Sequence, residues 1–141
     1  MRQTKPLLIL LLLTYGCSRQ SGLTLSGTPG SGDLVQAFML CVSNRDGHVT
    51  TNTLPVIQAT WTHQSRDAED IFLVSGDHFT EMQKVFEQAY GRPDTSLGSS
   101  AVAPMGYARA LTYSPKQCGV VLNLTGTSDQ TVVLVIGKQK L

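Results

Sequence analysis

The sequence predicts an α+β domain in which one amphipathic helix packs against an antiparallel sheet. Apolar residues recur at helical spacing over residues 78–90, whereas the neighbouring segments are short, rich in β-formers and separated by turn residues. Residues 131–136 (TVVLVI) are apolar on both faces, so this strand should be central and covered, and a helix lying on the sheet provides such a cover. A chain of 141 residues is one domain's worth once a processed segment is removed.

The segments before the helix are expected to be strands. Residues 35–42 (VQAFMLCV) form a mostly apolar run suited to a buried strand, and residues 44–47 (NRDG) after it are typical of a hairpin turn, because Asp-Gly tolerates positive φ. Residues 53–63 are rich in β-formers, although Pro55 lacks a backbone donor and favours an edge or the start of a strand. A short apolar strand is expected at residues 71–74, after a polar loop.

The helix is expected to run from Asp77 or His78 to about Tyr90. Asp77 can serve as the N-cap, and Gly91 and Pro93 supply the stop. The apolar stripe consists of Phe79, Met82, Val85, Phe86, Ala89 and Tyr90. The pattern predicts that this stripe covers the sheet.

Three further strands are expected after the helix, at residues 107–113, 118–125 and 131–136, with turns short enough for antiparallel hairpins. The expected order of elements is therefore ββ(β)αβββ. The long loop at residues 94–106 has little charge, and it is interpreted either as a linker or as a binding loop. The anchors of a binding loop here would be Leu97, Val102, Met105 and Tyr107.

The N-terminal residues have the pattern of an export signal. Arg2 and Lys5 precede an unbroken apolar run at residues 7–13, which is too short for a transmembrane helix because seven residues span only about 10 Å. Gly16 and Cys17 then resemble the end of a bacterial lipoprotein signal, in which a small residue precedes a cysteine that is acylated and becomes the new N-terminus. The bulky Tyr15 and a threonine three places before the cysteine depart from that pattern.

The resemblance implies that residues 1–16 are a signal peptide and that acyl chains on Cys17 anchor the protein in a membrane. Ser18 would favour the outer membrane or cell surface. The alternative is an ordinary secretory signal cut after Gly16, which would release the protein in soluble form. Residues 17–33, rich in glycine and serine, are expected to be a flexible tether, and residues 34–141 the folded domain.

The charge balance argues against nucleic acid as a partner. Eleven Lys and Arg against ten Asp and Glu give a net charge of +1, and aromatic residues make up only 6% of the chain. The protein therefore lacks both the basic footprint and the aromatic platform that nucleic-acid binders use. The expected partners are the membrane, through the lipid anchor, and another protein of the cell envelope.

Two cysteines remain once Cys17 is acylated. Cys41 and Cys118 both fall in expected strands, and an oxidising compartment would allow a disulfide between them. The alternative is two buried thiols that act as small apolar residues. A catalytic thiol would need a nearby base, and no histidine stands at an informative spacing from Cys118.

The other polar residues carry no metal or cofactor motif. The three histidines are expected to be exposed and lack the spacing of zinc ligands; they are His48, His63 and His78. Three acidic residues are expected to be a solvated loop rather than a calcium site; they are Asp67, Glu69 and Asp70. We therefore expect no metal and no cofactor.

The sequence also lacks the motifs of nucleophilic serines and of nucleotide-binding loops. These observations favour a non-enzymatic, lipid-anchored envelope protein whose domain binds another protein or an envelope component. The alternative is a small secreted hydrolase or an enzyme inhibitor. For an inhibitor, the expected fold resembles the cystatin-like architecture only in its layers, and the Q-x-V-x-G loop of that family is absent.

Overall fold

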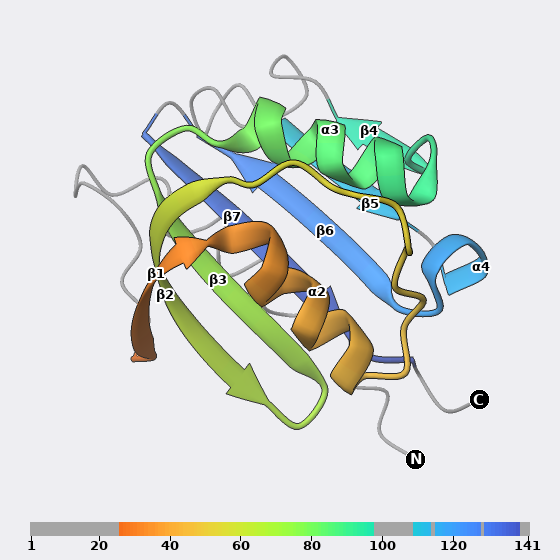
Figure 1. The fold of residues 1–141 in the computed structure, drawn as a ribbon, viewed down its shortest axis with the longest axis horizontal. Helices are drawn as coiled ribbons and strands as arrows, with labels where there is room; N and C mark the ends of the chain where they lie inside the picture. Colours follow the sequence, from red (N-terminus) through yellow and green to blue (C-terminus); the bar gives the residue numbers. More distant parts are fainter. Residues whose placement is uncertain (1–25, 98–108, 114, 128, 139–141) are drawn as a thin grey trace.

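The computed structural model describes residues 26–97, 109–113, 115–127 and 129–138. These residues form a seven-stranded sheet, antiparallel throughout, with two long helices lying on one of its faces (Figure 1). The α+β class is therefore confirmed. The elements are β1 (Thr28–Asp33), α2 (Leu34–Asn44), β2 (Gln58–Arg66), β3 (Glu69–Ser75), α3 (Phe79–Tyr90), β4 (Thr95–Leu97), β5 (Arg109–Tyr113), α4 (Pro115–Cys118), β6 (Val121–Gly126) and β7 (Gln130–Ile136).

The strands lie in the order β1-β2-β3-β7-β6-β5-β4. The last strand in the chain, β7, is therefore central: it pairs with β3 on one side and with β6 on the other, as its uniformly apolar sequence predicts. Helix α3 also matches its prediction, since its apolar stripe is buried and Gly91 ends it with a φ of 83°. The expected strand at residues 71–74 and the three after the helix are present as β3, β5, β6 and β7.

The segment expected to be the first strand is instead helix α2, so the predictions of a single helix and of the order ββ(β)αβββ are wrong. The backbone N–H of Val35 donates to Asp33 Oδ1 at 3.0 Å, which caps the helix. The 44–47 turn ends this helix rather than joining two strands: Asp46 has a φ of 56°, and Gly47 N–H donates to Val42 O. An apolar run with a single polar residue has no periodicity that separates a buried helix from a buried strand.

The folded part begins earlier than the sequence predicts. Thr28–Asp33, the last six residues of the expected tether, form β1 and pair with β2 along their whole length. Gly30 allows this pairing, because a Cβ there would lie 2.7 Å from Trp61 Cε2. The glycines that indicate flexibility in the sequence therefore make room for a packed indole at this position.

The β2–β3 hairpin is longer than predicted. Strand β2 starts at Gln58, after Pro55, and continues to Arg66, which pairs with Glu69 across a two-residue turn. The polar segment 64–70, expected to be a loop, is therefore mostly strand. This shift in the hairpin places Asp70 within the sheet.

The main core lies between the sheet and the two helices. Phe38 on α2 stacks against Phe86 on α3 with ring centroids 5.0 Å apart, and Phe86 contacts Tyr113 of β5 edge-on. A smaller buried cluster lies on the opposite face of the sheet and consists of Ile71, Leu73, Val132 and Leu134. Among the described residues, no helix is both long and apolar enough to cross a membrane.

Candidate functional site

The most chemically distinctive cluster of the described residues lies where helix α2 crosses the β2–β3 hairpin. Cys41 comes from α2, His63 from β2 and Asp70 from β3, and Arg45 directly follows the helix. His63 is paired with Phe72 in the sheet register, so it shares a face with Asp70, two residues before Phe72. Helix α2 lies over that same face (Figure 1), and Cys41 therefore comes close to His63 and Asp70.

Short contacts connect these side chains. Cys41 Sγ lies 3.8 Å from His63 Nε2, and the same nitrogen lies 2.9 Å from Asp70 Oδ1. The other carboxylate oxygen, Oδ2, accepts from Arg45 Nε at 2.6 Å. One ligand atom from each of the cysteine, histidine and aspartate lies within 4.8 Å of the other two.

Arg45 fixes the position of the carboxylate. Its two terminal nitrogens donate to the backbone carbonyls of Arg66 and Asp67 at 2.7 and 3.1 Å, so the guanidinium holds the β2–β3 turn as well as Asp70. The His63 ring is held by stacking on Phe72, with centroids 4.4 Å apart and an angle of 13° between planes. The side chain of His63 is 28% exposed, whereas that of Asp70 is 7% exposed, so the cluster opens to solvent at the histidine.

Burial raises the pKa of both acidic groups, but the hydrogen bonds to Asp70 make the outcome different. Burial alone would raise the pKa of Asp70, but hydrogen bonds from Arg45, His63 and Ser65 outweigh it and hold the pKa below its usual value. For Cys41, burial and the neighbouring Asp70 carboxylate raise the pKa of the thiol to about 12. Asp70 is therefore ionised at neutral pH while the Cys41 thiol keeps its proton.

This arrangement does not suit a catalytic thiol. A nucleophile–histidine–acid triad uses one ring nitrogen for the nucleophile and the other for the acid. Here His63 Nε2 faces both Cys41 and Asp70. An activated cysteine also needs a lowered pKa, and that of Cys41 is raised. The donor types are instead those of a transition-metal site: a sulfur, an imidazole nitrogen and a carboxylate oxygen.

Of the two alternatives for Cys41 and Cys118, the structure favours buried thiols over a disulfide between them. Neither lies in a strand: Cys41 is on α2 and Cys118 is the last residue of α4. The thiol of Cys118 donates to Val120 O at 2.6 Å. Cys41 thus lies in a helix where a strand was expected, and Cys118 ends a short helix at the point where a strand was expected to begin.

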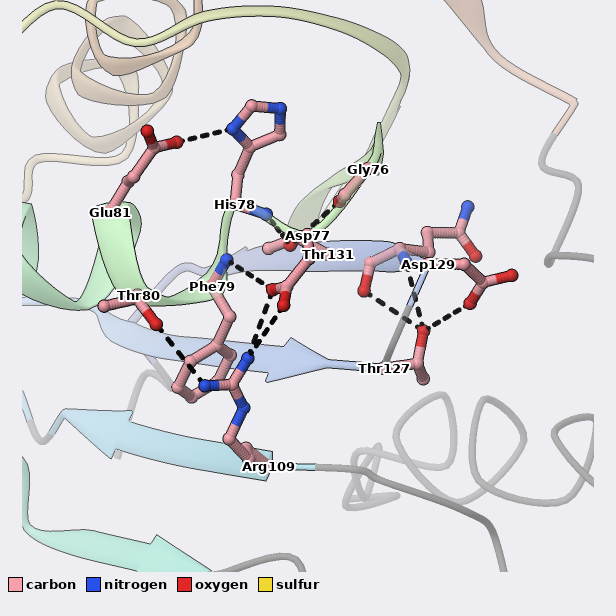
Figure 2. A network of polar contacts seen from close by, with 11 residues as sticks. Gly76, Asp77, His78, Phe79, Thr80, Glu81, Arg109, Thr127, Asp129 and Thr131 are labelled. Carbon is pink, nitrogen blue, oxygen red and sulfur yellow. Dashed lines mark hydrogen bonds and ion pairs between the residues drawn. The ribbon is translucent and has the colours of Figure 1, made fainter.

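The other two histidines, His48 and His78, make backbone hydrogen bonds that connect parts of the fold. His48 accepts a hydrogen bond from Tyr90 Oη on its carbonyl, and its N–H donates to Cys118 O. His78 occupies the N-cap position of α3 predicted for Asp77, and its backbone N–H donates to Thr131 Oγ1 at 2.8 Å (Figure 2).

A second polar network joins the start of α3 to strand β5. Arg109 Nη2 lies 3.1 Å from Asp77 Oδ1, and the guanidinium sits 4.2 Å from the centre of the Phe79 ring (Figure 2). Asp77 also accepts from Phe79 N–H, so it still supports the first turn of the helix. The partly exposed Arg109 and Asp77 side chains contact each other and the helix end, which indicates a role in fastening α3.

The segment 94–106, interpreted either as a linker or as a binding loop, lies mostly outside the described residues, as do Val102, Met105 and Tyr107. Leu97 falls in the short strand β4, where it pairs with Ala110. The expected signal peptide and Cys17 also lie outside the described residues.

The sequence did not reveal the cluster, for two reasons. His63 is expected from the sequence to be exposed and Asp70 to be solvated, whereas Asp70 is buried at 5% exposure. Period-two alternation through Trp61 and His63, followed by a tight turn at residues 67–68, would have placed Asp70 on the face of His63. The third member could not be found in this way, because Cys41 reaches the hairpin only from a helix.

The fold and the cluster define an α+β domain with a sulfur–imidazole–carboxylate group beneath a helix. Comparison with protein-family models, curated proteins and solved structures finds no match for this chain.

Proposed function

We propose that this protein is exported, is anchored to a membrane by acyl chains on Cys17, and acts through its folded domain as a binding module rather than as an enzyme. The observation that carries the proposal is the sequence MRQTKPLLILLLLTYGC, with its basic start, short apolar run and terminal Gly16-Cys17. Two or more acyl chains on Cys17 would give stable attachment without a membrane-spanning helix.

The start of the fold limits how far an acylated Cys17 would let the domain move from the membrane. Strand β1 begins at Thr28, eleven residues after Cys17. Eleven residues reach at most about 36–40 Å even when fully extended. An acylated Cys17 would therefore keep the domain beside the lipid headgroups and present it to partners in or near the envelope.

The chemistry of the main cluster supports binding over catalysis. Its thiol is protonated and shares a single imidazole nitrogen with the carboxylate, so the cluster has no activated nucleophile. The near-neutral net charge of the chain fits contact with a protein surface better than with a polyanion.

The anchor is tested by producing the full-length chain in a bacterial host with an alkyne-bearing fatty acid. We expect the wild-type protein to carry the label, to partition into the membrane fraction and to begin at Cys17. The variant Cys17→Ala should lose both label and membrane attachment, and Ser18→Ala serves as the matched control that keeps both. A wild-type protein that is unlabelled and soluble would overturn the anchor and favour the secretory alternative.

The binding role is tested by crosslinking in intact envelopes, followed by identification of the captured proteins. A partner captured by the wild-type chain in repeated experiments, and lost on competition with unlabelled protein, is the expected result. Turnover of a simple ester or peptide substrate by the purified protein would instead support the hydrolase alternative and overturn the proposal.

A further inference from the structure

We propose that Cys41, His63 and Asp70 together bind a divalent transition-metal ion, with Zn²⁺ as the best-fitting ion. The three residues come from α2, β2 and β3, so the ion would join the helix to the hairpin beneath it. This site goes beyond the binding-module proposal and does not depend on the lipid anchor.

The spacing of the ligand atoms fits tetrahedral coordination. With a Zn–S bond of about 2.3 Å and Zn–N and Zn–O bonds of about 2.0 Å, tetrahedral ligands lie about 3.5 Å apart for sulfur and nitrogen and about 3.3 Å for nitrogen and oxygen. The observed separations are 3.8 Å from Cys41 Sγ to His63 Nε2 and 2.9 Å from His63 Nε2 to Asp70 Oδ1. Each of these two pairs needs to change by only about 0.3–0.4 Å. The third pair, Cys41 Sγ and an Asp70 carboxylate oxygen, lies within 4.8 Å, so it has to close by up to about 1.3 Å to reach the tetrahedral separation of about 3.5 Å.

The donor set selects the class of metal. Calcium and magnesium prefer oxygen ligands throughout, whereas one thiolate, one imidazole and one carboxylate suit zinc and its neighbours in the first transition row. On binding, the proton of the Cys41 thiol leaves to solvent and the sulfur becomes a thiolate ligand. The proton that His63 Nε2 donates to the Asp70 carboxylate also leaves that nitrogen, so the ring binds through Nε2 and carries its proton on Nδ1. The thiolate and the Asp70 carboxylate then balance the two charges of the ion.

Arg45 would act as a positioning residue for the Asp70 ligand of this site. It occupies Asp70 Oδ2 and is itself held by two backbone carbonyls, which leaves Oδ1 directed toward His63. Outer-shell partners of this kind fix the orientation of ligating carboxylates. The stacking of His63 on Phe72 fixes the plane of the imidazole in the same way.

A purely structural ion-pair network is the competing explanation. Arg45, Asp70 and His63 alone would suffice to fasten α2 to the hairpin. That explanation gives no role to Cys41, whose sulfur faces the same imidazole nitrogen as the carboxylate. Three ligands would also leave a fourth coordination position for water or an outside ligand, at the side where His63 is partly exposed.

The experiment uses the full-length protein, purified in detergent or buffer according to the fraction that holds it, and stripped with a chelator. Titration with Zn²⁺ alone and with Co²⁺ as a spectroscopic probe should give one bound ion per chain, and Co²⁺ should show a thiolate-to-metal charge-transfer band. Zinc should also raise the melting temperature. These readouts do not require an acylated Cys17, so they can fail or succeed independently of the anchor.

Variants then identify the ligands. Cys41→Ala should abolish the charge-transfer band, and His63→Gln should weaken Zn²⁺ binding by at least the 10–100-fold typical of outer-shell changes. Cys118→Ala is the matched control, since it removes a buried thiol at a different place and should keep the band. Because His63 is partly exposed, His63→Gln tests the site even if the Cys41 variant does not fold.

Three results would overturn the proposal. One is the absence of saturable Zn²⁺ binding by the folded wild-type protein. Another is one-equivalent binding that persists unchanged in both the Cys41 and the His63 variants, which would place the ion elsewhere. The third is a loss of stability in His63→Gln without any effect of zinc on the wild-type melting temperature, which would support the ion-pair network instead.

Discussion

Residues 34–44 provide a sharp test of the fold, because a helix and a strand would bury different side chains of this segment. Phe38 and Leu40 are two positions apart, so in a strand they would share one face and be buried together. In a helix they lie about 200° apart. The structure buries Phe38 completely and leaves Leu40 63% exposed.

The magnitudes follow from that difference. Phe38 is fully buried and stacks on Phe86, so truncation by Phe38→Ala should lower the free energy of unfolding by about 3–5 kcal/mol. Leu40→Ala removes an exposed side chain and should change it by less than about 0.5 kcal/mol. For a domain whose total stability is about 5–15 kcal/mol, the first change is severe and the second is hardly measurable.

Urea unfolding followed by the fluorescence of the single tryptophan, Trp61, measures both effects. If Phe38→Ala prevents folding, Phe38→Leu gives a smaller loss that can still be compared with Leu40→Ala. Equal losses for Phe38 and Leu40 would show that the segment is a strand. A loss below about 1 kcal/mol for Phe38→Ala would show that α2 does not pack on the sheet as described.

Three further predictions concern the N-cap of α2, the close contact between Gly126 and Phe79, and the pH dependence of stability. Asp33→Ala removes the acceptor for Val35 N–H, so it should lower the free energy of unfolding by about 1–2 kcal/mol and the melting temperature by several degrees. Asp33→Asn should keep most of the stability. Thermal unfolding measures both variants, and equal melting temperatures would refute the cap. Gly126→Ala should lower the free energy of unfolding by about 1–3 kcal/mol, because the new Cβ would lie 2.8 Å from the Phe79 Cβ, which cannot rotate away. Urea unfolding measures this change, and an unchanged free energy would contradict the packing of α3 on β6. Burial raises the pKa of Tyr113 to about 12, above the ordinary value near 10. The unfolded chain therefore loses this proton first, and the free energy of unfolding should fall as pH rises from about 10 to 12. Phenolate absorbance measured against pH tests this, and titration of all tyrosines near pH 10 in the folded protein would contradict it.

The elements that could be predicted from the sequence are those whose patterns are local. Helix α3 has apolar residues at helical spacing with polar residues between them, and Gly91 ends it in a conformation that favours glycine. Strand β7 is apolar at successive positions, which requires cover on both faces and therefore a central place. Both patterns are read from neighbouring residues alone.

Helix α2 could not be predicted in the same way. Its sequence contains too few polar residues to display a period, so local propensity leaves helix and strand open. The choice is made by contacts from outside the segment: Asp33 caps its first turn, and Leu34 N–H donates to Ile57 O. The β1 segment was missed for a related reason, because a glycine-rich run becomes a strand only when β2 lies beside it.

The candidate site depends even more on distant parts of the chain. Cys41 and His63 are 22 residues apart and belong to different kinds of element, so no linear motif links them. By itself the sequence determined the α+β class, helix α3 and the central strand, because each of these is encoded by residues close together in the chain. Only the tertiary structure decided the state of α2 and the meeting of Cys41, His63 and Asp70, because both result from packing between segments that are far apart in the chain.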